Sequence, residues 1–115
     1  MNTPYDALYL FIGGEWISAE GRDTAAVINP ATASEIGRVP LATSADLDHA
    51  LEVARLSFQT WRQMVPDQRA KILKRAADLI LERAPHIASQ MTLEEGKPLG
   101  ESIDEVTRAA EYFEW

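Results

Sequence analysis

The hydrophobic pattern changes its period near residue 44, and this change decides which folds are open to the chain. Before it, short β-branched and aromatic runs alternate with glycine and proline, which is typical of strands joined by turns. After it, apolar residues recur every three or four positions, as in an amphipathic helix. The first such stripe has Ser44 as its expected N-cap and consists of Leu47, Ala50, Leu51, Ala54, Phe58 and Trp61. The pattern predicts strands over about 8–39 and helices over about 44–115.

Four short strands are expected before the change of period. The runs 8–12 and 15–18 flank Gly13-Gly14, and a tight turn between antiparallel strands needs the positive φ that glycine adopts. These two runs therefore predict a β-hairpin. Two more strands are expected at 24–28 and 35–39. A proline soon follows each of them and is expected to end it, because proline cannot donate a ladder hydrogen bond.

Proline and glycine also divide the helical part into separate helices. Pro66 suits the first turn of a second helix and Pro85 that of a third, because a proline there loses no helical hydrogen bond. Gly96 is expected in the left-handed conformation that ends the third helix. A fourth helix reaches the last residue without a stop signal, so we expect the chain to be part of a longer one; its apolar stripe is Leu99, Ile103, Val106, Ala110 and Phe113.

The pair Gly96-Lys97 raises the question of phosphate binding. A P-loop requires Gly-x-x-x-x-Gly-Lys-Ser/Thr, but Met91 occupies the first glycine position and Pro98 the hydroxyl position. Lys97 is expected instead near the C-terminus of a helix, where a cation is favoured by about 0.3–1 kcal/mol. A Walker-type nucleotide site is therefore not predicted.

Charge and composition argue against several classes of function. With 11 basic and 18 acidic side chains the formal net charge is −7, which disfavours nucleic acid or an anionic membrane as a partner. The absence of cysteine excludes disulfides, thiolate metal sites and a cysteine nucleophile within these residues. The longest apolar run is too short for a signal peptide or a membrane span, so we expect a cytoplasmic location.

Side chains with catalytic or ligating potential are scattered. Glu101, Asp104 and Glu105 can place two carboxylates on one helix side, an arrangement found more often on solvated faces than in acid–base pairs. His49 and His86 lack a His-x-x-x-His or Glu-x-x-His neighbour, so surface or partly buried histidines are expected rather than metal ligands. The sequence contains no Gly-x-Ser-x-Gly and no Gly-x-Gly-x-x-Gly motif. Residue chemistry alone predicts a non-catalytic segment.

The order of the motifs is more specific than any one of them. From Phe11 to Trp115 the segments run "FIGGEWI", "VINPATASEIGRVPLATSADLDHAL", "WRQMVPDQRAKILKRAADLI", "TLEEGKPLGE" and "EVTRAAEYFEW". In this order and spacing the chain resembles the N-terminal segment of the NAD(P)-dependent aldehyde dehydrogenase superfamily. Its Glu-Gly-Lys-Pro-Leu and Glu-Tyr-Phe-Glu-Trp segments are most similar to the succinate-semialdehyde dehydrogenase branch.

This resemblance implies a fold and a function for the parent protein. The fold is expected to be α/β and aldehyde-dehydrogenase-like, with an N-terminal β-hairpin and short strands followed by four helices. Residues 1–115 are then an incomplete, N-terminal part of the coenzyme-binding domain, and the rest of the parent chain is their first partner. The parent is expected to oxidise an aldehyde, such as succinate semialdehyde, to the carboxylic acid with NAD or NADP, and to form a homo-dimer or homo-tetramer.

The family's chemistry is expected to lie outside these residues. In the family a cysteine thiolate attacks the aldehyde, hydride passes to the nicotinamide ring, and a glutamate activates the water that releases the acid. The resemblance implies that this cysteine, this glutamate, the oxyanion asparagine and the Gly-rich coenzyme turn all lie beyond residue 115. The segment is therefore expected to contain no catalytic or coenzyme-binding residue, to bind no coenzyme tightly and to be inert alone.

Two ligand contacts are expected within the segment, and the first of them is implied by the family resemblance. The resemblance implies a structural Na⁺ or K⁺ on the backbone of Val27 and Ile28 and on Glu94, because hard cations prefer carbonyl and carboxylate oxygens. Part of its ligand set is expected outside the segment, so the segment alone is not expected to bind the ion tightly. The alternative for Glu94 is an ordinary exposed acid. Arg108 is the candidate for contact with a substrate carboxylate, and its alternative role is an exposed i,i+3 ion pair with Glu105.

Two other classes of function compete with this interpretation. The chain can be an independent, non-catalytic α+β interaction domain that docks on a partner through its acidic last helix. An enzyme segment should expose the apolar stripe over 99–113 and either self-associate or be partly molten, whereas an independent domain should unfold cooperatively as a monomer. A nucleotide-binding module, the third possibility, should be stabilised by NAD⁺.

Overall fold

The computed structural model describes residues 4–115, in which strands come first and helices second. The elements are β1 (Leu10–Ile12), β2 (Glu15–Ile17), β3 (Thr24–Asn29), β4 (Ser34–Pro40), α1 (Ser44–Gln63), α2 (Pro66–Glu82), α3 (Ala84–Glu95) and α4 (Leu99–Glu114). The change from strands to helices falls at residue 44, where the hydrophobic period changes. The predicted α/β class, with short strands followed by four helices, is confirmed.

The four strands form two separate antiparallel hairpins. β1 pairs with β2, and the turn glycines Gly13 and Gly14 have positive φ values of 64° and 89°, which confirms the predicted hairpin. β3 pairs with β4, and the register of this pair shifts between Val27 and Ile28, which marks a β-bulge. The hydrophobic pattern predicted the strands but carried no signal for the bulge.

Helix α1 begins at Ser44, but its N-cap is Thr43. The Thr43 hydroxyl accepts a hydrogen bond from the Asp46 backbone N–H at 3.2 Å, and the Asp46 carboxylate accepts one from the Thr43 backbone N–H at 2.7 Å. The expectation that Ser44 caps the helix is therefore wrong by one residue. A reciprocal capping box needs a suitable side chain three positions after the cap, and Thr43 has Asp46 there while Ser44 has Leu47.

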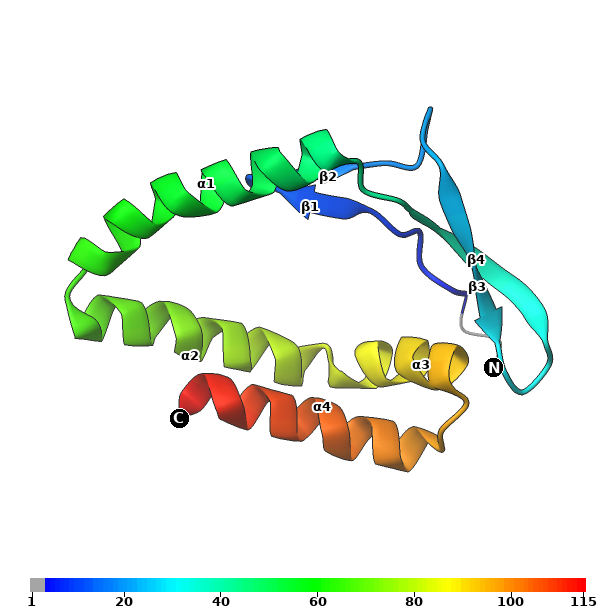
Figure 1. Cartoon of the computed structure of the whole chain (residues 1–115). Helices are drawn as coiled ribbons and strands as arrows, with labels where there is room; N and C mark the ends of the chain where they lie inside the picture. The colour runs from blue at the N-terminus through cyan, green and yellow to red at the C-terminus, as the bar shows by residue number, and fades with distance from the viewer. Residues whose placement is uncertain (1–3) are drawn as a thin grey trace.

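The remaining helix boundaries lie close to the predicted positions. α2 begins at Pro66, and α3 begins at Ala84, one residue before the expected Pro85. α3 ends at Gly96, whose φ of 74° is left-handed and whose N–H donates to the Thr92 carbonyl oxygen at 2.9 Å. α4 then runs back along α2 and α3 (Figure 1).

The helices α2, α3 and α4 share a small core. Its buried hydrophobic side chains, within residues 4–115, are Ala77, Ala84, Ala88, Val106 and Ala110. Small residues let the helices approach closely, but they remove little apolar area from water, so the hydrophobic stabilisation they supply is modest. Ser102 is buried beside them and shares a hydrogen bond of 2.9 Å with Thr92, which joins α4 to α3.

Helix α1 lies apart from this core, beside the β1–β2 hairpin (Figure 1). It contains no buried residue, and its apolar side chains Leu47, Leu51 and Phe58 are 58%, 62% and 56% exposed. The Cα atoms span 48 × 35 × 16 Å with a radius of gyration of 16.9 Å, against about 13 Å for a compact domain of this length. Domains bury their apolar faces between at least two layers. Here α1 and the hairpin have no such second layer within the described residues.

The apolar stripe of the last helix is half covered. Val106 and Ala110 are buried against α2 and α3, whereas Leu99, Ile103 and Phe113 stay 46%, 38% and 43% exposed. The expected exposure of the stripe over 99–113 therefore holds at Leu99, Ile103 and Phe113 but not at Val106 and Ala110, because α4 packs on the other two helices there. The larger exposed apolar surface lies on α1.

Candidate functional site

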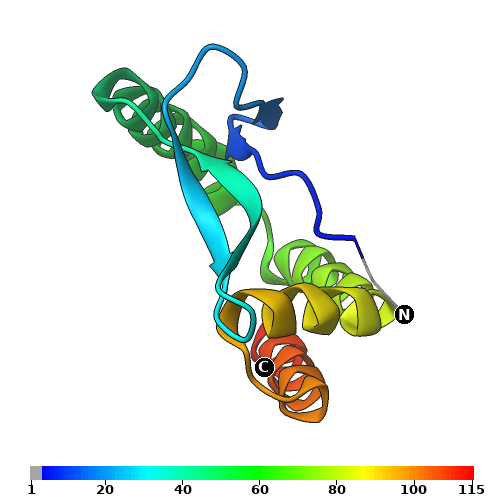
Figure 2. The same ribbon diagram turned by 90° about the vertical axis from the view of Figure 1, so that its right-hand side faces the viewer.

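The end of strand β3 meets the end of helix α3 (Figure 2). Pro30 follows β3 directly, and a Cβ placed on Gly96 would stand 2.8 Å from the Pro30 ring. This close approach depends on a glycine at the end of α3. The fold thereby places the element that carries Val27 and Ile28 beside the element that carries Glu94.

The β-bulge falls at the two residues that are expected to supply carbonyl ligands. Val27 pairs with Gly37 and Ile28 with Glu35, so Ile36 has no partner in the register. A bulge disrupts the hydrogen-bond ladder locally and bends the strand. Val27 is half-buried and Ile28 is exposed. The residue that the bulge leaves unpaired is Ile36 of β4, opposite the junction of Val27 and Ile28.

Glu94 contacts a residue from the start of the chain. The Tyr5 hydroxyl donates a hydrogen bond to its carboxylate, although the two residues lie 89 positions apart. Burial of the Tyr5 side chain, followed by its hydrogen bond to Glu94, raises the pKa of Tyr5 to about 12. The hydroxyl therefore stays protonated at neutral pH and remains a donor. No local motif in the sequence indicates this long-range contact.

Three further contacts fix the residues around Tyr5 on α3. The Asp6 backbone N–H donates to the Gln90 side-chain oxygen at 2.9 Å, and the Gln90 amide donates to the Pro4 carbonyl oxygen at 3.1 Å. His86 Nε2 lies 2.6 Å from an Asp6 carboxylate oxygen. His86 is about half exposed, in agreement with the predicted surface histidine. We name residues 4–6 the N-terminal strap.

The types of ligand expected here, one carboxylate and two backbone carbonyl oxygens, suit a singly charged ion. Glu94 carries one carboxylate, and the other expected ligands are the neutral carbonyl oxygens of Val27 and Ile28 on β3; divalent cations in proteins usually take several carboxylates. Across residues 4–115, no group of three or more His, Cys, Asp or Glu side chains is placed to hold a metal ion. The residue types at Val27, Ile28 and Glu94 therefore fit Na⁺ or K⁺ better than Mg²⁺, Ca²⁺ or Zn²⁺.

Lys97 joins the ends of α3 and α4. Its Nζ atom lies 2.7 Å from a Glu95 carboxylate oxygen and 2.5 Å from one of Glu105. Hydrogen bonds to Glu105 first and Glu95 second raise the pKa of Lys97 to about 12. Lys97 therefore joins the two helices across their turn, which agrees with its predicted place at a helix end.

Arg108 lies on the exposed side of α4, among acids. It lines two surface hollows, one shared with Glu111, Tyr112 and Trp115 and one shared with Glu101, Asp104 and Glu105. The alternative i,i+3 ion pair with Glu105 is not formed, because Glu105 contacts Lys97 instead. Within the described part of the chain the Arg108 guanidinium has no ion-pair partner. It is accessible to an external carboxylate.

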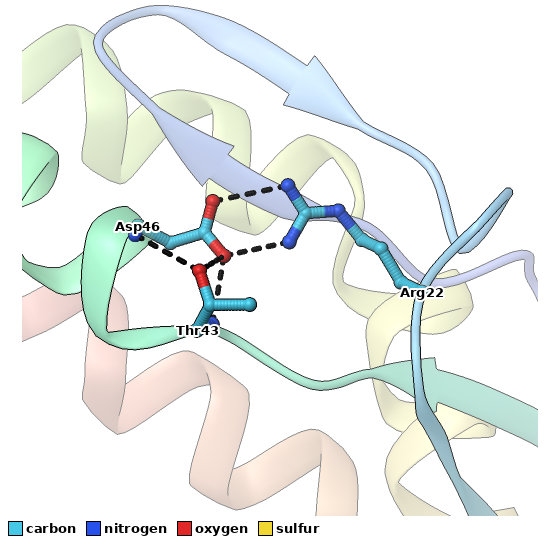
Figure 3. Close-up of polar contacts among 3 residues, drawn as sticks. All are labelled: Arg22, Thr43 and Asp46. Carbon is cyan, nitrogen blue, oxygen red and sulfur yellow. Dashed lines mark hydrogen bonds and ion pairs between the residues drawn. The ribbon is translucent and has the colours of Figure 1, made fainter.

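A second polar cluster, which sequence reasoning missed, fixes the start of α1 (Figure 3). The two terminal guanidinium nitrogens of Arg22 donate to the Asp46 carboxylate, at 2.6 and 3.0 Å, and the Thr43 hydroxyl donates to the same carboxylate at 2.7 Å. The Arg22 contact, followed by the Thr43 hydrogen bonds, holds the pKa of Asp46 well below its ordinary range. The Thr-x-x-Asp spacing could have revealed the capping box, but nothing local indicates Arg22.

Known proteins resemble this chain in sequence and in fold. The model of the aldehyde dehydrogenase family matches residues 16–115. The chain is 41% identical over 105 residues to malonate-semialdehyde dehydrogenase 2 of Oceanobacillus iheyensis, which covers 91% of this chain and 22% of that protein. The structure of succinate-semialdehyde dehydrogenase from Burkholderia pseudomallei superposes with a TM-score of 0.89 at 36% identity, over 100% of this chain and 24% of that one.

A coenzyme-bound relative shares the fold as well. A variant of betaine aldehyde dehydrogenase from Staphylococcus aureus, solved in complex with NAD⁺, superposes with a TM-score of 0.83 at 31% identity, over 90% of this chain and 21% of that one. The chain thus spans about a fifth to a quarter of the length of the relatives it matches. Within residues 4–115, no helix combines the length and the apolar character that crossing a bilayer demands.

Proposed function

This chain belongs to the aldehyde dehydrogenase family, and from that membership we propose that it is the N-terminal segment of an NAD(P)-dependent enzyme that oxidises an acidic semialdehyde to the dicarboxylic acid. The segment supplies scaffold rather than chemistry, as the outer strands and helices of the coenzyme-binding domain. The substrate class is supported by relatives that act on malonate semialdehyde and succinate semialdehyde. A cytoplasmic location and a homo-dimeric or homo-tetrameric parent stay predictions.

The observation that carries this proposal is the incomplete burial of the apolar surface. The core consists of four alanines and one valine, while α1 buries none of its side chains. A helix with an exposed apolar face of this size needs a partner surface. The rest of a dehydrogenase chain is such a partner, since the relatives are four to five times longer than the part that matches.

The same observation weighs against an independent interaction domain. A domain that folds alone must offset the entropy of ordering its chain, mainly by burying apolar area. The small core of α2, α3 and α4 covers one end of the molecule and leaves α1 and the β1–β2 hairpin outside it.

We assign the cation, but not the coenzyme, to residues of this segment. No Gly-rich turn for a coenzyme exists in the sequence, so no step of hydride transfer is assigned to any of its residues. The cation is assigned to Val27, Ile28 and Glu94, where it would neutralise the carboxylate and tie β3 to α3. The cation would therefore stabilise the junction of β3 and α3 and take no part in the chemical reaction.

A chimeric enzyme tests the proposal. This chain replaces the matching N-terminal segment of succinate-semialdehyde dehydrogenase from Burkholderia pseudomallei, and NAD(P)-linked oxidation of succinate semialdehyde is measured. We expect turnover within about an order of magnitude of the parent enzyme, because the scaffold superposes closely. The parent enzyme without its N-terminal segment is the control and should be inactive. A folded, coenzyme-binding chimera without turnover would contradict the proposal.

The same chimera tests Arg108 as a substrate contact. An arginine–carboxylate contact is charge-assisted, and its loss should weaken only the binding of a charged substrate. Arg108→Ala should raise KM for succinate semialdehyde about tenfold or more and leave KM for a neutral aliphatic aldehyde nearly unchanged. Arg55→Ala is the matched control, since Arg55 is an exposed arginine paired with Glu52 on α1. Equal changes in KM for both substrates would remove the assignment.

A further inference from the structure

Three side chains of helix α3 hold the N-terminal strap. They are spaced four residues apart and so form one row along the helix; they are His86, Gln90 and Glu94. Gln90 accepts from a backbone N–H of the strap at 2.9 Å and donates to one of its backbone carbonyl oxygens at 3.1 Å. One turn before Gln90, His86 Nε2 lies 2.6 Å from an Asp6 carboxylate oxygen. One turn after it, Glu94 accepts from the Tyr5 hydroxyl. The strap is therefore bound through its backbone and through two of its side chains.

Tyr5 extends this contact from α3 to strand β4. Its ring lies against Gly37, where an added Cβ would stand 2.7 Å from two ring carbons. Gly37 does not have the left-handed φ of the turn glycines, so the ring, and not the backbone, disfavours a larger residue there. Because its hydroxyl contacts α3 and its ring contacts β4, Tyr5 lies between these two elements.

The strap leads directly to the β1–β2 hairpin, which has few other contacts to hold it. Residues 7–9 run from α3 across to β1 (Figure 1). β1 and β2 have 3 residues each, and a two-stranded hairpin of this kind is marginally stable by itself. Among the described elements the hairpin packs mainly on α1, and α1 packs mainly on β1. We name the hairpin and α1 together the outer layer, which few noncovalent contacts join to the core of α2, α3 and α4.

From this geometry we propose that the N-terminal strap is a clasp. Docked on α3, it holds the outer layer in place relative to the core; released, it lets the outer layer open as one unit while α2, α3 and α4 stay packed. Proteins open in cooperative units of this size, and the units with few buried apolar contacts open most readily. The clasp needs neither the proposed cation nor the catalytic function, because every partner of the strap lies within residues 4–94.

The experiment is hydrogen exchange followed by mass spectrometry, on the 115-residue chain and on the chimeric enzyme. Tyr5→Ala removes the hydroxyl and the ring together. We expect faster exchange in the strap, where the Asp6 amide donates to Gln90 in the docked state. We also expect exchange in β1, β2 and α1 to accelerate about tenfold, the effect of losing one or two exposed hydrogen bonds. Exchange around the buried Val106 and Ala110 of α4 should not change.

A second variant releases the strap without altering it. Gly37→Ala places a methyl group where the Tyr5 ring lies, so it should accelerate exchange in the same segments as Tyr5→Ala. In a chain that already has Tyr5→Ala, Gly37→Ala should add little, because residues that act through one contact are not additive. Gly100→Ala is the matched control, since a Cβ there meets open space, and it should leave the strap and the outer layer unchanged.

Three results would contradict the clasp. Faster exchange confined to the strap, with unchanged exchange in β1, β2 and α1 in either protein, would show that the strap holds nothing but itself. Equal acceleration in all four helices would show that the outer layer does not open as a unit. A strap that exchanges as fast as an unstructured peptide in the unaltered chain would overturn its docking on α3.

Discussion

Arg22 and Asp46 connect the turn before β3 to the first turn of α1. The pair is bidentate, the side chains are 22% and 12% exposed, and Thr43 binds the same carboxylate. Planar, charge-assisted contacts of this kind are among the stronger polar interactions in proteins. This pair is better shielded than the pair of Arg55 and Glu52, whose side chains are 62% and 53% exposed.

The Arg22–Asp46 pair predicts a pH dependence of stability. The folded-state pKa of Asp46 lies below its ordinary 3.8, so the unfolded chain binds more protons and the pair's contribution is present above that pH. Arg22→Ala should lower the midpoint of thermal loss of helix signal at neutral pH. The difference from the unaltered chain should shrink as pH falls below 3.8. Arg55→Ala should change the midpoint little at either pH, and an Arg22→Ala effect that persists unchanged in acid would contradict the assignment.

At the scale of elements, the cap of α1 makes the next prediction. Thr43→Ala removes the side chain that accepts from the Asp46 backbone N–H, and loss of such a cap costs about 1 kcal/mol. Amide exchange in the first turn of α1 should accelerate accordingly. Ser44→Ala, one residue later, should change exchange little because Ser44 is not the cap. A larger increase in amide exchange in Ser44→Ala than in Thr43→Ala would instead identify Ser44 as the cap.

The two glycines that flank the α3–α4 turn predict opposite effects. Gly96 has a left-handed φ of 74° and Pro30 against it, so Gly96→Ala should weaken the end of α3 by about 1–2 kcal/mol. Gly100 lies within α4 with open space around it, so Gly100→Ala should stabilise α4 by about 0.5–1 kcal/mol. Hydrogen exchange of the α3 and α4 amides measures both. If both substitutions stabilised the helices, or both destabilised them, this turn geometry would be contradicted.

The sequence predicted the elements better than the contacts between them. Local signals such as the Gly13-Gly14 turn, Pro66 and Gly96 act over a few residues, and the structure has each in its predicted role. The contact of Tyr5 with Glu94 joins residues 89 positions apart, and the β-bulge at Val27 depends on the register of a partner strand. Such features arise from tertiary packing, which periodicity and turn chemistry do not encode.

At the scale of the whole molecule, the flat shape and the exposed apolar face of α1 predict that the isolated chain self-associates. Apolar patches of this extent on an isolated chain tend to pair with one another. Leu51→Glu, in the middle of the α1 face, should lower the mass measured by light scattering while helix content is kept. Glu52→Gln, at the neighbouring exposed position, is the control and should leave the mass unchanged. A monomer with sharply cooperative unfolding would instead favour an independent domain.

The central claim is that this chain contributes scaffold to an oxidation that needs a thiol supplied by other residues. The most direct test is an assay of the purified 115-residue chain with NAD⁺ or NADP⁺ and succinate semialdehyde, next to the chimeric enzyme. Because the chain contains no cysteine, we expect coenzyme reduction by the chimera and none by the chain alone. Coenzyme reduction by the isolated chain, at a rate proportional to its concentration and with no longer protein present, would contradict the account.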